Sequence, residues 1–113
     1  MKKVTFHKIA NSVEEIEFGV NNLVQLNAGG KKICLVKHDE TLFACTAQCP
    51  HASGVLADGF IDPLGNIVCP LHRYKYDLKN GRNVSGEGYF LKTYAVEIRD
   101  DGIYVGIDSF SLF

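Results

Sequence analysis

Apolar and polar residues alternate over short stretches along most of the chain, which is the pattern of half-buried β-strands. Runs rich in Gly, Asn, Asp and Pro separate these stretches and are typical of turns. The pattern predicts strands over residues 4–9, 23–26, 32–37, 41–46, 59–61, 66–68, 74–78, 91–98 and 103–107. The sequence therefore predicts an all-β fold of antiparallel hairpins.

Short turn sequences join neighbouring strands of this pattern. Residues 39–40 centre one hairpin, and the Asp-Pro-Leu-Gly and Arg-Asp-Asp-Gly sequences at residues 62–65 and 99–102 centre two more. Asn-Gly at residues 80–81 ends a further strand. Residues 12–15 have the serine-to-glutamate spacing of a capping box, so about one turn of helix is expected there.

The hairpin about residues 39–40 places Cys34 opposite Cys45. Such a pair could form a strained cross-strand disulfide. In a reducing cytosol, two free thiols that behave as small buried hydrophobes are the favoured interpretation.

Composition limits the classes of protein that the chain can represent. With 113 residues we expect one domain spanning residues 1–113. A net charge of -1 argues against nucleic-acid binding, so partners are expected to be proteins. No run of about 18 apolar residues occurs, and the lysines near the start precede no apolar stretch, so we expect a cytoplasmic protein. The apolar segment 109–113 is expected to dock on the domain itself, or alternatively on another subunit.

Two short clusters combine cysteine with histidine. The first is Cys49-Pro50-His51, and the second is Cys69-Pro70-Leu71-His72. Thiolate and imidazole ligands select zinc or iron–sulfur clusters, and the proline after each cysteine stiffens its loop. Two cysteines and two histidines are also the ligand set of a Rieske 2Fe-2S cluster.

The residues around these clusters resemble the Rieske family. Residues 69–81 are similar to its C-P-x-H-G-aromatic-basic-aromatic-D-L-x-x-G run, and residues 52–59 are similar to the segment after its first cluster. The resemblance is specific over residues 49–81 and moderate over residues 91–105. Arg73 replaces the usual glycine, and an arginine adopts positive backbone angles at a cost.

This resemblance implies an antiparallel β-sandwich with a small cluster-binding subdomain at about residues 46–82. It implies one Rieske-type 2Fe-2S cluster, with Cys49 and Cys69 on the inner iron and His51 and His72 on the outer iron. It implies no catalytic residue, because the chemistry is one-electron transfer. The chain is therefore expected to be an electron-transfer protein and not an enzyme.

The resemblance also indicates a reduction potential. High-potential respiratory members carry an extra cysteine in each loop and a serine donor, and the corresponding positions here are Gly54, Leu71 and Tyr74. Tyr76 keeps a hydroxyl that those members also have, although both tyrosines could equally be ordinary packing aromatics. We expect a potential in the lower half of the Rieske range of roughly -150 to +300 mV.

The function that this resemblance favours is a soluble carrier that passes electrons from a flavin reductase to a terminal oxygenase. The chain is too short for the mononuclear iron domain of the oxygenase itself. An alternative is the Rieske-like small subunit of a multi-subunit reductase such as nitrite reductase, which co-purification with a large subunit would reveal. A structural zinc domain is a remote alternative, and it would be colourless.

Other polar residues have simpler interpretations. His7 and His38 lie outside the two clusters and are expected to be solvated or satisfied locally. Four basic residues surround Asp77 after the second cluster and form either a solvated face or a docking patch for an acidic partner: Arg73, Lys75, Lys79 and Arg82. The loop at residues 82–88 lacks the proline that related ferredoxins often carry near the cluster.

Overall fold

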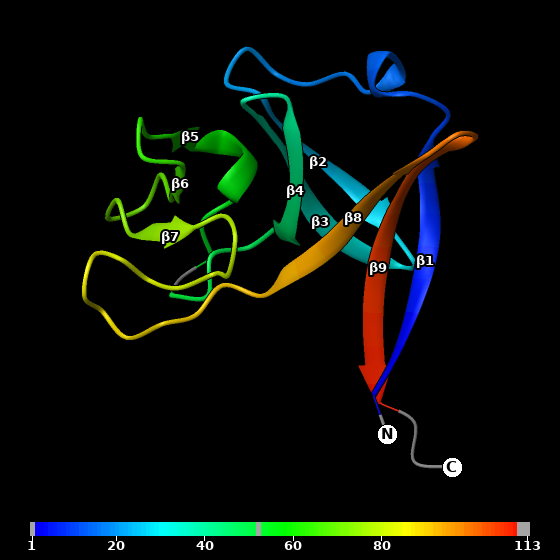
Figure 1. Cartoon of the computed structure of the whole chain (residues 1–113). Coiled ribbons are helices and arrows are strands. Elements are labelled where there is room, and N and C mark those ends of the chain that lie inside the picture. Colours follow the sequence, from blue (N-terminus) through cyan, green and yellow to red (C-terminus); the bar gives the residue numbers. More distant parts are fainter. Residues whose placement is uncertain (1, 52, 111–113) are drawn as a thin grey trace.

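The computed structural model describes residues 2–51 and 53–110, and nearly all of its regular structure is antiparallel strand (Figure 1). Two single-turn 3-10 helices, η1 (Val13–Glu15) and η2 (Leu56–Asp58), interrupt the strands. The strands are β1 (Lys2–Ala10), β2 (Leu23–Ala28), β3 (Lys31–His38), β4 (Thr41–Thr46), β5 (Phe60–Ile61), β6 (Asn66–Val68), β7 (Lys75–Asp77), β8 (Thr93–Arg99) and β9 (Gly102–Phe110). The all-β prediction is confirmed.

Six strands form one sheet in the order β1-β9-β8-β4-β3-β2. β4 and β8 are joined by two residue pairs alone, Ala44 with Tyr94 and Cys45 with Thr93. The sheet bends at this short junction, so its two halves face each other as the layers of a sandwich (Figure 1). Between them lies an apolar core of Ala28, Ile33, Leu35, Ala44, Val105 and Ile107.

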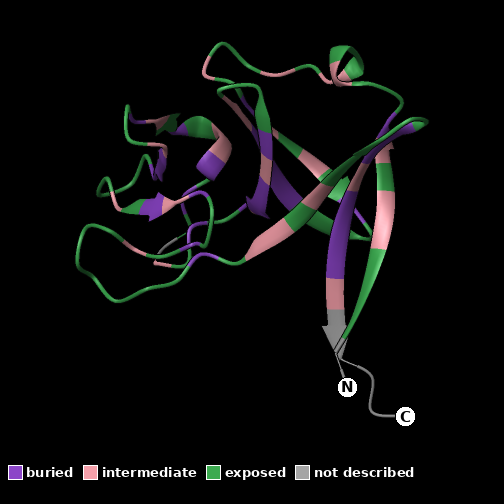
Figure 2. Cartoon of the chain, viewed as in Figure 1, coloured by how far each residue is buried: buried purple, intermediate pink, exposed green. Residues whose placement is uncertain are grey.

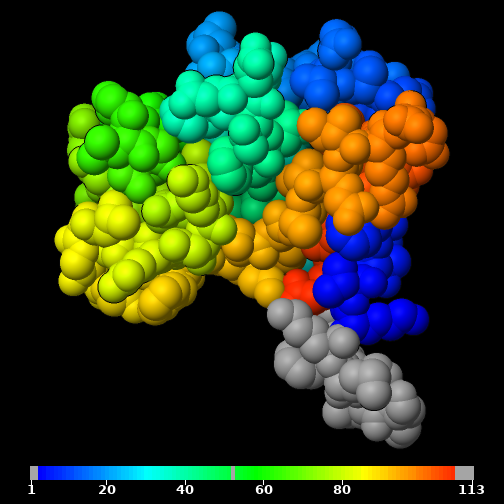
Figure 3. Space-filling model, in the orientation of Figure 1, coloured from blue at the N-terminus to red at the C-terminus, as the bar shows by residue number. Residues whose placement is uncertain are grey.

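A second sheet, in the order β5-β6-β7, lies beside β3 and β4 (Figure 1). It packs on the large sheet through another core, whose buried members are Leu23, Cys34, Val36, Cys45, Cys49, Leu56, Ile67, Cys69, Tyr76, Leu78 and Leu91. In the space-filling view the green-to-yellow residues of this region gather on one side of the molecule (Figure 3). The predicted cluster-binding subdomain, residues 46–82, contains the whole of this small sheet.

β3 supplies side chains to both cores. Ile33 and Leu35 point into the sandwich, whereas Cys34 and Val36 point toward the small sheet. None of these four side chains is exposed, so the middle of the strand is buried on both faces (Figure 2). Burial on both faces explains why the middle of β3 is a continuous apolar run, whereas a half-buried strand would alternate apolar and polar residues.

The hairpin between β3 and β4 has the predicted register. Asp39 and Glu40 adopt positive φ angles of 49° and 63°, the geometry of a two-residue turn that follows the strand twist. Cys34 therefore pairs with Cys45, and both are buried free thiols, as expected. The hydrogen bond with Cys34, together with burial, raises the pKa of Cys45 well above its usual value.

The capping box expected at residues 12–15 is not formed. Ser12 makes no capping hydrogen bond with its side chain; instead, Glu15 accepts hydrogen bonds from the backbone and side-chain nitrogens of Asn11, both at 3.1 Å. Within residues 2–51 and 53–110, no helix has the length and apolar character needed to cross a bilayer. The expected docking of segment 109–113 rests on side chains outside the described part of the chain.

Candidate metal centre

The first Cys-His cluster lies in a tight loop that follows β4. The backbone N–H of Cys49 donates to the carbonyl oxygen of Gly54 at 2.9 Å and closes the loop. Gln48 and Val55, just outside it, form an isolated antiparallel bridge. The loop is therefore fixed at both ends, and η2 then leads the chain into β5.

The second cluster lies in the loop between β6 and β7 and is closed in the same way. The N–H of Cys69 donates to the carbonyl oxygen of Tyr74, again five residues further along and again at 2.9 Å. His72 and Arg73 adopt positive φ angles of 63° and 58°. Arg73 thus takes the glycine-like conformation that its position in the motif predicted, and it does so at the cost of side-chain strain.

Strand pairing brings the two loops together. Phe60 at the start of β5 pairs with Val68 at the end of β6, so the segments that precede and follow this hairpin are neighbours. The centroids of the His51 and His72 rings lie 4.9 Å apart. The hairpin expected from the turn at residues 62–65 therefore places both clusters at one end of the small sheet.

The four side chains are arranged with sulfur inside and imidazole outside. Cys49 and Cys69 are buried, His51 is half-buried and His72 is exposed. This is the disposition that the sequence resemblance implies for a Rieske cluster. Ligation by these four residues stays a prediction.

Two features of the loops fit a bound group. A Cβ atom added to Gly54 would lie 2.8 Å from Cys69 Sγ and 3.3 Å from Leu71 Cγ, so the loops touch at a position where a side chain has no room. His51 Nδ1 is buried without a hydrogen-bond partner, which suits a nitrogen reserved for coordination.

The sulfur atoms lie in an apolar environment. In the protein without metal, burial raises the pKa of Cys69 to about 11, although the backbone N–H of Leu71 opposes this shift. The hydroxyl of Tyr76 lies 3.4 Å from Cys49 Sγ, and the Tyr76 ring is fully buried. Burial, followed by the contact with Cys49, raises the pKa of Tyr76, so its hydroxyl stays protonated and can donate to a thiolate.

Aromatic rings enclose His51. The ring of Tyr74 lies 3.9 Å from it at a tilt of 32°, and the ring of Tyr89 approaches it edge-on at 5.5 Å. Tyr74 is thus a rim aromatic beside one histidine, while Tyr76 contacts a cysteine. Sequence reasoning missed Tyr89, which lies in an irregular polar loop where no periodicity marks it. The exposed apolar residues Leu71 and Phe90 lie in the second loop and just after Tyr89.

The remaining candidate residues lie apart from this cluster. His38 Nε2 is 3.4 Å from a carboxylate oxygen of Asp39, the local satisfaction expected of it. His7 packs its ring over Gly29 in the turn between β2 and β3. Among the basic residues after the second cluster, Lys75 Nζ lies 4.0 Å from the Asp62 carboxylate. The others, Arg73, Lys79 and Arg82, are exposed, and their docking role stays a prediction.

Comparisons with known proteins agree with this geometry. The family model described as "Rieske [2Fe-2S] domain" matches residues 8–94. The chain is 28% identical over 97 residues to the ferredoxin subunit of 3-phenylpropionate/cinnamic acid dioxygenase from Photorhabdus laumondii, covering 85% of this chain and 90% of the relative. It is 22% identical over 82 residues to the ferredoxin component of an alkene monooxygenase system from Xanthobacter autotrophicus. This match covers 73% of this chain and 67% of the relative.

Solved structures share the fold. The ferredoxin of carbazole 1,9a-dioxygenase from Nocardioides aromaticivorans matches with a TM-score of 0.72 at 19% identity, over 88% of this chain and 93% of that one. A protein assigned as the small subunit of an NADH-dependent nitrite reductase from Mycobacterium tuberculosis matches with a TM-score of 0.73 at 18% identity, over 95% and 96%. Since the family match spans most of the chain, the protein belongs to the Rieske [2Fe-2S] domain family and is an electron-transfer protein.

Proposed function

We propose that the protein is a one-electron carrier that takes electrons from a flavin-dependent reductase and delivers them to a terminal oxygenase. In this proposal Cys49 and Cys69 hold the inner iron of its 2Fe-2S cluster, and His51 and His72 hold the outer iron. The ferredoxin components of two oxygenase systems, one at 28% and one at 22% identity, support this function over most of the chain.

The observation that carries the proposal is the position of the histidine pair. The His51 and His72 rings lie 4.9 Å apart beside exposed apolar residues, while both cysteines lie behind them in the core. When bound, a Rieske cluster accepts and releases one electron at a time. The two imidazoles at the surface bring a docked partner close to the redox centre, and the rings of Tyr74 and Tyr89 pack against His51.

The same residues support a potential in the lower half of the Rieske range, roughly -150 to +300 mV. Gly54 and Leu71 face each other across the two loops, where the high-potential members implied by the sequence resemblance carry their extra cysteines. No disulfide can therefore form there. Tyr76 contributes one hydrogen bond to Cys49 Sγ, and Tyr74 brings an aromatic ring where those members have a serine.

The proposed redox partners are inferred from the partners of similar proteins. A solved complex of oxidized ferredoxin with reduced oxygenase in carbazole 1,9a-dioxygenase matches the chain with a TM-score of 0.74 at 20% identity, over 88% of this chain and 91% of that one. A carrier of this kind needs a flavin-dependent reductase as donor and an oxygenase as acceptor. We place it in the cytoplasm, where reduced nicotinamide is available to the reductase.

An absorption and low-temperature EPR spectrum, taken before and after dithionite, tests the ligand assignment. We expect a brown protein that gives a rhombic signal on reduction, and we expect His72→Ala to abolish that signal. His38→Ala is the matched control, because it removes a half-buried histidine remote from the two loops. A colourless protein with stoichiometric zinc, or an unaltered signal in the His72 variant, would contradict the assignment.

The small subunit of a nitrite reductase is a second candidate, favoured by the structural likeness over 95% of the chain. A carrier exchanges partners and elutes alone in size-exclusion chromatography, whereas a subunit remains bound to a large redox protein. Tagged protein purified from its native host distinguishes the two. Stoichiometric recovery of a large reductase subunit would overturn the carrier proposal while leaving the cluster assignment intact.

A further inference from the structure

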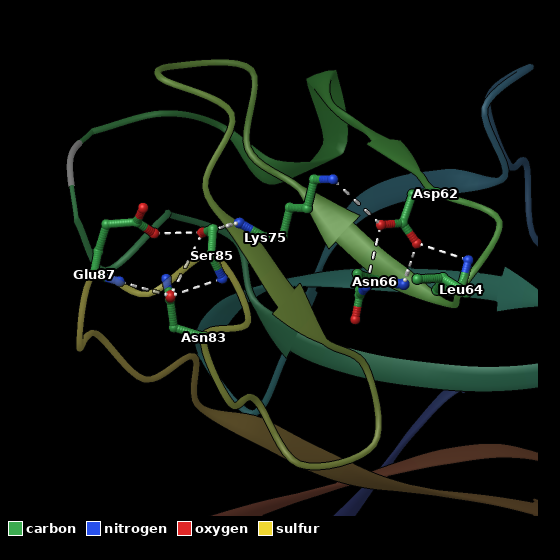
Figure 4. A network of polar contacts seen from close by, with 7 residues as sticks. All are labelled: Asp62, Leu64, Asn66, Lys75, Asn83, Ser85 and Glu87. Carbon is green, nitrogen blue, oxygen red and sulfur yellow. Dashed lines mark hydrogen bonds and ion pairs between the residues drawn. The ribbon is translucent and has the colours of Figure 1, made fainter.

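One asparagine organises the loop that follows β7. The side-chain oxygen Oδ1 of Asn83 accepts hydrogen bonds from the backbone nitrogens of Ser85 at 3.1 Å and Glu87 at 3.0 Å (Figure 4). It also accepts one from the backbone nitrogen of Gly86 at 2.8 Å. Ser85 Oγ also donates to a carboxylate oxygen of Glu87. The Asn83 side chain thus makes three of the hydrogen bonds that hold this loop, which has no proline.

The backbone fixes Asn83 beside Tyr76. The two residues form an isolated antiparallel bridge. On one side the N–H of Asp77 donates to the Arg82 carbonyl, and on the other the N–H of Val84 donates to the Lys75 carbonyl, both at 2.9 Å. Asn83 therefore has a defined position relative to the tyrosine that contacts Cys49.

The other end of the Asn83 amide is buried and lacks a conventional partner. Its nitrogen Nδ2 has no acceptor within hydrogen-bond limits among the described residues, and a buried donor of this kind is unusual in a folded protein. Paired residues of an antiparallel bridge place their side chains on the same face, so the Asn83 amide lies on the side of the Tyr76 ring, whose hydroxyl contacts Cys49 Sγ. A hydroxyl that donates to sulfur keeps oxygen lone pairs that can accept from an N–H.

We propose that Asn83 is a positioning residue for the redox centre: in the cluster-loaded protein its unpaired Nδ2 donates to the Tyr76 hydroxyl oxygen and orients that hydroxyl toward Cys49 Sγ. Donation to the oxygen polarises the O–H group and strengthens its bond to sulfur. Hydrogen bonds to ligand sulfur favour the reduced state, so Asn83 raises the reduction potential. The inference rests on the proposed assignment of Cys49 as a cluster ligand.

The test measures reduction potentials of the cluster-loaded protein by protein-film voltammetry. Asn83→Asp keeps an acceptor for the three loop nitrogens and removes the donor. Because it also adds a charge, Val84→Asp, which places a carboxylate on an exposed neighbour, is the matched control. Asn83→Ser is an uncharged second variant, whose hydroxyl can accept from backbone nitrogens as in serine turns but does not extend to Tyr76.

We expect Asn83→Ser to lower the reduction potential by an amount that corresponds to at least a threefold change in the redox equilibrium constant, where a tenfold change is about 59 mV. Asn83→Asp should lower the potential by at least the same amount more than Val84→Asp does. In a Tyr76→Phe background both excess shifts should vanish, since the residue then has nothing to position.

Equal shifts of the potential in the wild-type and Tyr76→Phe backgrounds would show that Asn83 acts independently of Tyr76. A shift in Asn83→Asp no larger than in Val84→Asp would show that the added charge accounts for the whole effect. Either result overturns the inference while the Rieske spectrum stands. A wild-type chain without a 2Fe-2S spectrum would instead refute the proposed function, and the inference with it.

Discussion

The contact between the two ligand loops at Gly54 leads to a sharp prediction. An added Cβ would lie 2.8 Å from Cys69 Sγ, whereas apolar heavy atoms normally stay about 3.5–4.0 Å apart. Gly54 does not have the positive φ that disfavours a side chain, so Gly54→Ala is a purely steric perturbation. The substitution must therefore push the two loops apart by about 0.7 Å or displace the sulfur by as much.

Such a displacement is larger than a metal site tolerates. Ligand distances in metal sites hold to within about 0.2 Å, so under the proposed ligation Cys69 cannot bind iron and also accommodate the methyl group. We expect Gly54→Ala to lower the ratio of iron and acid-labile sulfide to protein by at least half. Overpacking of about 1–3 kcal/mol should also lower the thermal midpoint, by about 4 °C for each kcal/mol.

Gly30→Ala is the matched control. Gly30 lies in the turn between β2 and β3 with a φ of 80°, and no atom lies within 4 Å of an added Cβ. Its alanine variant should lose about 1 kcal/mol to backbone strain but retain full iron content. Full cluster occupancy with an unaltered EPR spectrum in the Gly54 variant would refute the close apposition of the loops.

Three further predictions concern stability and reactivity. Although burial opposes the shift, hydrogen bonds from Asn66 hold the pKa of Asp62 below its usual 3.8; Asp62→Asn should cost about 2 kcal/mol at pH 7. Thermal midpoints between pH 8 and 3 should show this difference constant above about pH 5 and shrinking below it, as the carboxyl is protonated first in the unfolded chain and then in the folded one. Arg73→Gly should relieve the positive φ and raise the free energy of unfolding by about 1 kcal/mol, whereas a lower thermal midpoint would contradict this. Because buried thiols react slowly, iodoacetamide should label Cys34 and Cys45 only after unfolding, as mass spectrometry can check.

Local sequence signals predicted the hairpins and the motif well. The two-residue turn at Asp39 and Glu40 determines which residues face each other, so the pairing of Cys34 with Cys45 followed from counting alone. The Arg73 position was recognised as a strained one because the motif expects glycine there, and its φ of 58° agrees. These successes share one cause, since each depends on residues close together in the chain.

The elements that sequence reasoning did not foresee depend on distant segments. The first strand, β1, pairs with the last strand, β9, and no local sequence pattern predicts this pairing. Asn83 and Tyr89 lie in a polar loop without periodicity, and their importance comes from Tyr76 and His51, which the fold brings beside them. The bend between β4 and β8, joined by two residue pairs, is likewise a property of the closed sheet.

The core of the sandwich and the core beneath the small sheet have different roles: the first stabilises the scaffold, and the second includes the candidate site. The sandwich core contains no predicted ligand, whereas Cys49 and Cys69 are themselves members of the core beneath the small sheet. Strands of two or three residues are too short to be stable alone. The small sheet therefore depends on packing against Cys34 and Val36 of β3, and on any bond that joins its two loops. A group that links Cys49 to Cys69 closes the intervening hairpin and stabilises it by restricting the unfolded chain. Cluster binding and the order of this sheet are thus coupled, while the sandwich stands on its own contacts.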